Sequence, residues 1–124
     1  DADTEEQDVI LLGDFNLPFD DQIWKNMWPL NLYPVLGPVV PTMISDSEVY
    51  ANFWLNPGLT SEYTGRAGVD RFDETAFDGN DNAASLMVSD HRPIWAIFRT
   101  DVDDDGPSEM TYIAPKGWAE IKSR

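Results

Sequence analysis

The longest unbroken hydrophobic pattern in the chain lies near its beginning. Residues 9–12 are all aliphatic, and Gly13 closes the run. A continuous apolar run of this length, ended by a glycine, is typical of a strand that is buried on both faces. We therefore predict a central strand over residues 8–15.

The next apolar residues are spaced for one face of a helix, and they are Ile23, Trp24, Met27 and Trp28. Asp20 or Asp21 can cap the beginning of this helix. It has to end before Pro29, because the residue that precedes a proline avoids the helical region. A short helix is therefore expected here.

Prolines and turn-forming residues dominate the middle of the chain. The five prolines between residues 29 and 57 favour loops with edge pairing over long helices. Within this region, residues 49–55 are rich in aromatic and β-branched types and predict a strand. Residues 65–82 are dense in Gly, Asp and Asn and predict mostly loop. A helical turn is expected over 83–88 and a strand over Ile94–Phe98.

Composition indicates a folded domain. The 124 residues are 42% hydrophobic and 12% aromatic, which excludes a disordered chain and allows one domain with a buried core. No apolar run approaches the roughly 18 residues of a membrane span, so no transmembrane segment is expected. The absence of cysteine excludes a disulfide scaffold and a thiolate metal site. Localisation stays open, with a secreted or periplasmic location slightly favoured.

The formal net charge of −15 changes the picture of possible partners. Such a field repels phosphate backbones, so a sequence-independent DNA clamp is disfavoured unless cations intervene. The charge also marks a boundary, because residues 101–105 are almost all Asp. We predict that residues 1–100 form the folded part and that 101–124 form an acidic linker and tail. Because the chain begins with Asp and soon enters a strand, we expect it to be a piece of something longer.

The first chemically suggestive motif is Gly13-Asp14-Phe15-Asn16, at the end of the first predicted strand. Side chains two apart on a strand share a face, so Asp14 and Asn16 are expected to point together. A carboxylate and an amide oxygen suit a hard cation such as Mg²⁺. The alternative is a tight turn that uses Gly, Asp and Asn for their backbone preferences.

The second motif, Ser89-Asp90-His91-Arg92-Pro93, holds the single histidine of the chain and precedes the last predicted strand. An Asp beside a His can supply a metal ligand or base and a polarising imidazole in adjacent positions. The alternative is an ordinary loop histidine. Arg92 is a candidate to clamp a phosphate, with a surface ion pair equally open.

Taken together and in this order, the two motifs resemble those of the endonuclease/exonuclease/phosphatase superfamily, which has the DNase I-like fold. The resemblance covers residues 8–99 and corresponds to the C-terminal half of that family's domain. It implies an α/β fold (α+β in some schemes), a two-sheet β-sandwich flanked by helices, of which this chain supplies about half.

The resemblance also implies roles for individual residues. Asp14 matches the aspartate that binds or positions the attacking water, and Asn16 matches the asparagine that contacts the scissile phosphate. Asp90 matches a metal ligand, and His91 matches the histidine that hydrogen-bonds a phosphate oxygen. The implied activity is phosphodiester hydrolysis with Mg²⁺, or with Mn²⁺ or Ca²⁺, in which Asp14 and Asp90 hold the metal and Asn16 and Arg92 bind the substrate. Nucleic acid, phospholipid and inositol phosphate are all candidate substrates.

Two departures from the family pattern count against full activity. The middle strand of the family carries an acid that orients the histidine, and here Ala51 stands in that place, with Asp70 as an alternative alignment. The family also draws a metal-binding glutamate and other site residues from its N-terminal half, which is not visible here. We expect the chain alone to be nearly inactive and to need the missing half as a partner, or else to self-associate through its exposed apolar face. The rival hypothesis is a catalytically degraded relative that acts as a binding or interaction module.

Two weaker signals remain. Residues 101–106 begin like a calcium loop, but Tyr112 stands where a bidentate glutamate is needed, so a solvated acidic linker is favoured. The tryptophans could stack on bases or lipid headgroups, and we expect most of them to be core residues instead. The residues concerned are Trp24, Trp28, Trp54 and Trp95.

Overall fold

The structure is a computed structural model that describes residues 8–38 and 40–101. The predicted acidic tail lies outside the described residues. So do Trp118, a tryptophan of that tail, and the part of the calcium-like loop that follows Asp101. In chain order the elements are β1 (Leu11–Asp14), η1 (Gln22–Asn26), η2 (Trp28–Leu30), β2 (Tyr33–Pro34), β3 (Ala51–Leu55), β4 (Tyr63–Val69), α1 (Phe72–Thr75), α2 (Asp81–Met87) and β5 (Ile94–Phe98).

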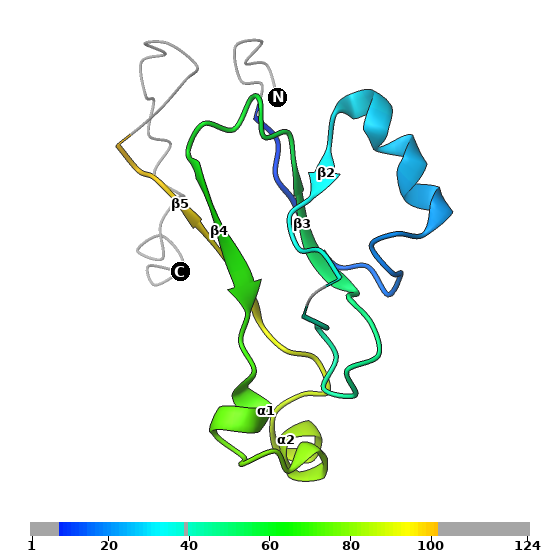
Figure 1. Cartoon of the computed structure of the whole chain (residues 1–124), viewed down its shortest axis with the longest axis vertical. Helices are drawn as coiled ribbons and strands as arrows, with labels where there is room; N and C mark the ends of the chain where they lie inside the picture. Colours follow the sequence, from blue (N-terminus) through cyan, green and yellow to red (C-terminus); the bar gives the residue numbers. More distant parts are fainter. Residues whose placement is uncertain (1–7, 39, 102–124) are drawn as a thin grey trace, which may run out of the picture.

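The strands form two separate antiparallel sheets. One has the order β1-β3-β2, and the other is the two-stranded β4-β5 sheet, whose strands are connected through α1 and α2. Figure 1 shows the two sheets running alongside each other, with α1 and α2 together at one end and the η1–η2 segment beyond β2. At the coarse level this is a mixed architecture of helices and antiparallel sheets, compatible with the expected α/β class. Within residues 8–38 and 40–101, every helix is too short or too polar to be a bilayer-spanning segment.

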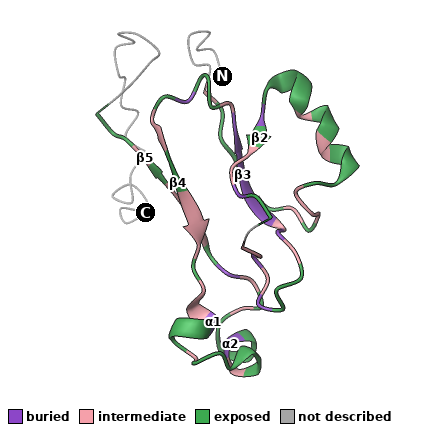
Figure 2. Cartoon of the chain, in the orientation of Figure 1, coloured by how far each residue is buried: buried purple, intermediate pink, exposed green. Residues whose placement is uncertain are grey.

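The buried strand of the molecule is β3. All five of its residues are buried, and Trp54 is only 1% exposed (Figure 2). It lies between β1 and β2, so both of its backbone edges are paired. Its buried Asn52 behaves as a piece of backbone, because its amide accepts from Leu36 N at 2.9 Å and donates to Leu36 O at 2.9 Å. The strand predicted over 49–55 is thereby confirmed.

The first strand is shorter than predicted and is not buried on both faces. Among the described residues, β1 pairs with β3 alone and forms the edge of its sheet, and Leu11 and Leu12 are exposed. Its apolar composition reflects a surface that the described residues do not cover, so the expectation of a central, buried strand over 8–15 is wrong.

The predicted helix over the Ile23 to Trp28 stripe is replaced by two short 3₁₀ helices. Asp21 does cap the first of them, accepting from Ile23 N at 2.9 Å. Trp24 packs edge-on against Phe15, with ring centroids 5.1 Å apart, and lies over Trp54 at 4.6 Å. The tighter helical turn breaks the four-residue register of the stripe, so Ile23 and Trp28 remain exposed.

The segment predicted as loop over 65–82 contains most of β4, the whole of α1 and the beginning of α2. β4 pairs with β5 in the register Val69↔Ile94 to Arg66↔Ile97, with an irregularity between Tyr63 and Arg66. Its glycines made it resemble a loop, but the long-range pairing with β5 overrides that local preference. The strand Ile94–Phe98 is confirmed, and the helical turn expected over 83–88 corresponds to α2.

Candidate functional site

The two motifs meet at the junction of the two sheets. Asp14 is the last residue of β1, and His91 lies in the extended segment that leads into β5. The Oδ2 atom of Asp14 is 3.5 Å from Nδ1 of His91, within ion-pair distance, and both side chains are partly exposed. The fold therefore brings together an acid and an imidazole that are distant in sequence.

Backbone pairing positions each member of this pair. Asp14 lies opposite Ala51 in the β1–β3 register, and Phe15 N donates to Tyr50 O at 3.0 Å. His91 forms an isolated antiparallel bridge with Met43. The same short pairing continues on both sides of this bridge. Ile44 N donates a hydrogen bond to Asp90 O at 3.0 Å, and Arg92 N donates one to Thr42 O.

Beyond Asp14 the strand gives way to a turn. Asn16 has a left-handed backbone (φ 50°), and its N–H donates to Asp14 Oδ1 at 3.0 Å. Asn is one of the few residue types that accept this conformation readily. The strand alternation from which Asp14 and Asn16 were expected to point together therefore ends before Asn16. The exposed Asn16 side chain is positioned by the turn instead, and the turn alternative describes its backbone correctly.

The imidazole of His91 lacks a hydrogen-bond partner where one is expected. Its Nδ1 atom is buried without a hydrogen bond in the described structure, although Asp14 Oδ2 is close. Side chains directly opposite each other in an antiparallel pair share a face, so the methyl group of Ala51 lies beside Asp14 on this face. A longer polar side chain at position 51 would extend from there.

The alternative alignment through Asp70 is not favoured by position. Asp70 follows β4 in the second sheet, where it is exposed and its N–H donates to Pro93 O at 2.8 Å. Ala51, in contrast, begins the strand that pairs directly with β1.

Asp90 faces a different surface from its neighbour His91. It lines a pocket of about 300 Å³ between the 43–45 segment and α2, together with Met43, Ile44, Ser45, Asp81, Asn82 and Ser85. Successive side chains in an extended segment point to opposite sides, which explains why Asp90 and His91 diverge. The structure thus brings Asp14 to His91, whereas Asp90 faces the pocket beside α2 and not this pair.

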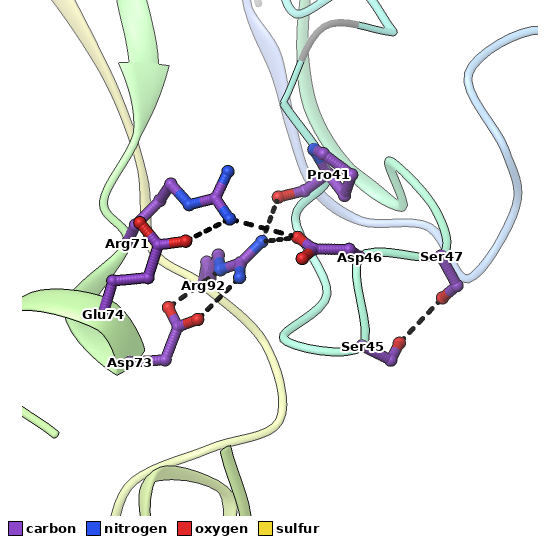
Figure 3. A network of polar contacts seen from close by, with 8 residues as sticks. All are labelled: Pro41, Ser45, Asp46, Ser47, Arg71, Asp73, Glu74 and Arg92. Carbon is purple, nitrogen blue, oxygen red and sulfur yellow. Dashed lines mark hydrogen bonds and ion pairs between the residues drawn. The ribbon is translucent and has the colours of Figure 1, made fainter. Parts of the chain in front are cut away.

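Arg92 is buried rather than available at the surface. Its guanidinium donates to both carboxylate oxygens of Asp73, at 2.9 and 2.6 Å, to Asp46 Oδ1 at 2.6 Å and to Pro41 O at 3.2 Å (Figure 3). These hydrogen bonds, led by those with Asp73, raise the pKa of Arg92 above its ordinary value and lower that of Asp73. With its donors directed inward, Arg92 forms buried and part-buried ion pairs instead of the phosphate clamp or surface pair that the sequence suggested.

The described residues contain no ready cluster of metal ligands. Within residues 8–38 and 40–101, no three His, Asp or Glu side chains gather closely enough to hold a metal ion. Mg²⁺ in proteins is commonly bound by one or two carboxylates, with water and substrate phosphate completing its shell. The exposed Asp14 carboxylate beside His91 fits that mode and leaves most of the shell to other groups, whereas Asp90 faces the pocket beside α2.

The tryptophans divide between core and surface. Trp54 is core as expected, but Trp28 and Trp95 are exposed. Trp24, Trp28 and Trp54 line a pocket of about 270 Å³ beside η1. Because Trp24 packs on Phe15, whose side chain alternates with that of Asp14, this pocket lies on the sheet face away from the Asp14–His91 pair.

Sequence reasoning missed three residues that support the site through hydrogen bonds to its neighbours, namely Thr42, Asp46 and Asp73. They come from loops and a short helix with no motif of their own. One signal was available, because an arginine directly before a predicted apolar strand needs a carboxylate partner if it is buried. Nothing in the pattern showed which of the many aspartates that partner is.

Comparisons of the chain with protein-family models, with curated proteins and with solved structures found no match. A functional assignment therefore depends on the two motifs and on the geometry that joins them.

Proposed function

We propose that the chain is part of a divalent-metal-dependent phosphodiesterase of the nuclease or phosphatase type, with a DNase I-like two-sheet fold of which it supplies about half. The observation that carries the proposal is the 3.5 Å approach of Asp14 Oδ2 to His91 Nδ1 across the junction of the two sheets. The two antiparallel sheets, with short helices at their margins, are compatible with that fold.

Each residue at the junction has a chemical part in this proposal. The Asp14 carboxylate, held by the N–H of Asn16, positions water for in-line attack on phosphorus. With Nδ1 turned toward Asp14, His91 has Nε2 left to donate to a phosphate oxygen. The exposed amide of Asn16 contacts the phosphate. Asp14 would hold a divalent cation, Mg²⁺ or else Mn²⁺ or Ca²⁺, that would stabilise charge on the phosphate oxygens, whereas Asp90, expected as the second ligand, faces the pocket beside α2 instead.

The substrate is a phosphoester such as nucleic acid, a phospholipid headgroup or inositol phosphate. The fold alone does not choose among these classes. A net charge of −15 disfavours bare duplex DNA, whose phosphates the field of the chain repels. The N-terminal half of the domain is the expected partner, and the exposed apolar edge at β1 is the surface that it would cover.

A second candidate, a catalytically degraded relative that serves as a binding or interaction module, is favoured by one observation. Within the part of the chain that the structure describes, the Nδ1 atom of His91 has no hydrogen bond, and Ala51 occupies the position from which an orienting acid would reach it. An imidazole without such a partner has no fixed tautomer, so it is a poor proton donor to substrate.

Changing Ala51→Asp tests these two candidates against each other. If the site is a hydrolase that lacks only its orienting acid, EDTA-sensitive turnover of bis-p-nitrophenyl phosphate and plasmid nicking with Mg²⁺ should rise roughly 10- to 100-fold from a low starting rate. Ala51→Asn is the matched control, because it has the same shape without the charge, and its turnover should stay near that of the parent chain.

Metal titration of the same variants supplies the opposing outcome. Folded Ala51→Asp protein that, with the missing N-terminal half supplied, neither turns over substrate nor binds Mg²⁺ or Mn²⁺ contradicts the hydrolase and favours the module. Conversely, a normal enzymatic rate from the unmodified chain shows that no orienting acid is missing.

A further inference from the structure

Arg92 is tied to three parts of the molecule at once. Its side chain is 1% exposed and holds Asp73 of α1, Asp46 of the preceding loop and the carbonyl of Pro41 (Figure 3). Its backbone N–H donates to Thr42 O at 2.7 Å. The position of residue 92 is therefore fixed through both its side chain and its main chain.

Fixing residue 92 also fixes the direction of its neighbour. Residues 90–92 are extended and pair with residues 42–44, so successive side chains leave the segment on opposite sides. Since the guanidinium of Arg92 is anchored toward α1 and the 41–46 loop, the imidazole of His91 is directed the other way, where Asp14 lies.

Thr42 connects the same cluster to the other half of the pair. It is fully buried, and its hydroxyl accepts from Tyr50 N at 2.9 Å and from Ala51 N at 3.2 Å. Ala51 pairs with Asp14 in the sheet. A continuous set of contacts thus runs from Arg92 through Thr42 and β3 to Asp14. Asp14 in turn lies against His91, the neighbour of Arg92 in the chain.

We propose that Arg92, clamped by Asp73 and Asp46, is a positioning residue that holds His91 against Asp14. This inference rests on the proposed function only in giving His91 a task, since the placement of the ring can be measured without activity. It reassigns Arg92 from substrate binding to the support of the reactive pair.

The single histidine makes the test direct. In NMR spectra of the full 124-residue chain, the ring signals of His91 are unambiguous, and contacts between its ring protons and the β-protons of Asp14 report the approach of the two side chains. Asp46→Asn is the first variant. The Asp46 side chain is 55% exposed, and Asn tolerates its left-handed backbone (φ 54°), so the chain should fold.

Removing the charge of Asp46 weakens its 2.6 Å bond to Arg92, because an ion pair becomes a hydrogen bond from the guanidinium to a neutral amide oxygen. We expect the His91 ring signals to shift or broaden and their contacts with Asp14 to weaken, while the amide signals of β4 and β5 stay in place. Asp78→Asn is the matched control, an exposed aspartate with nearly the same backbone (φ 51°), and it should leave His91 unchanged.

Arg92→Lys is the stronger variant, since it keeps the charge but loses the planar fork that bonds both oxygens of Asp73. Where turnover is measurable, it should lower kcat roughly 10- to 100-fold with little change in KM, as expected for a displaced catalytic group. If Arg92→Lys fails to fold, Asp46→Asn decides alone.

Unchanged His91 signals and Asp14 contacts in folded Asp46→Asn protein would overturn the positioning role, whatever the activity. Altered His91 signals, together with an absence of turnover when the N-terminal half of the domain is supplied, would support the positioning role and contradict the proposed function. The two inferences can therefore fail separately.

Discussion

At the residue scale, the interior of this protein holds an ion pair as well as apolar side chains. Asp73 and Arg92 are each only 1% exposed and bind each other through two hydrogen bonds. Replacing such a pair by apolar residues of the same shape is often harmless, but removing one partner leaves an uncompensated buried charge. Each of the two residues can therefore be buried as a charged group only while the other is present.

This pair predicts a specific dependence of stability on pH. Hydrogen bonds from Arg92 lower the pKa of Asp73 below its ordinary value of 3.8, so the unfolded chain binds the proton more readily than the folded one. The contribution to stability is complete above the unfolded pKa and is lost as the pH falls through the folded value. We expect the free energy of unfolding, measured with urea, to fall as the pH is lowered below about 4.

Asp73→Asn checks the cause. At pH 7 it should cost about 3 to 5 kcal/mol of unfolding free energy, and the acid-induced loss should become smaller. Glu74→Gln is the control on the same helix, because Glu74 makes only an exposed pair with Arg71 and should change stability by less than about 1 kcal/mol. Equal effects of the two substitutions would contradict the role given to the buried pair.

At the scale of elements, the pairing of β4 with β5 includes one close contact between a backbone and an aromatic ring. Gly68 lies opposite Trp95, and a Cβ atom at position 68 would come within 2.7 Å of the indole ring. A glycine lowers the intrinsic preference for a strand, and here its value lies in the space that it leaves. Gly68 is one of the residues that made β4 resemble a loop in the sequence. Its lack of a side chain is also what allows the Trp95 ring to lie against the sheet.

Gly68→Ala should displace the ring of Trp95 and destabilise the β4–β5 sheet. We expect a loss of about 1 to 3 kcal/mol in unfolding free energy, as for other overpacked sites, partly relieved because Trp95 is exposed and can move. Gly37→Ala provides the comparison, since a Cβ atom there meets nothing within 4 Å. If the two variants unfold at the same urea concentration, the close packing of Gly68 on Trp95 contributes nothing.

At the scale of the whole molecule, charge and apolar surface oppose each other. The net charge of −15 keeps copies of the chain apart, whereas the β1 edge exposes four consecutive apolar side chains, Val9, Ile10, Leu11 and Leu12. An apolar edge strand is a ready template for another strand. In the absence of a partner, we expect self-association that becomes stronger with salt, because salt screens the repulsion.

Leu12→Lys tests the route of that association. The Leu12 side chain is 60% exposed on the edge strand, and a lysine there should shift the chain toward monomer in sedimentation experiments. Leu86→Lys places the same charge on α2, at a leucine that is 88% exposed, and should have a smaller effect. A chain that is already monomeric at high salt would argue against the need for a partner at β1.

Local sequence patterns predicted some secondary-structure elements better than others. The aromatic and β-branched run over 49–55 predicted β3, and the run Ile94–Phe98 predicted β5, because packed side chains favour strands in both the pattern and the fold. The apolar run at 9–12 predicted a strand correctly but placed it in the centre, since a sequence does not show which strand lies beside it. The stripe from Ile23 to Trp28 indicated helical structure but not its 3₁₀ form.

The sequence by itself determined the chemical types at the candidate site, Asp14 with Asn16 and Asp90 with His91, because those types and spacings are read along one chain. Only the tertiary structure decided that Asp14 meets His91, that Asp90 faces α2 and that Arg92 is buried on Asp73. These outcomes depend on strand pairing and on which side of an extended segment each residue leaves. Both are set by contacts between parts of the chain that are remote in sequence, which no local pattern contains.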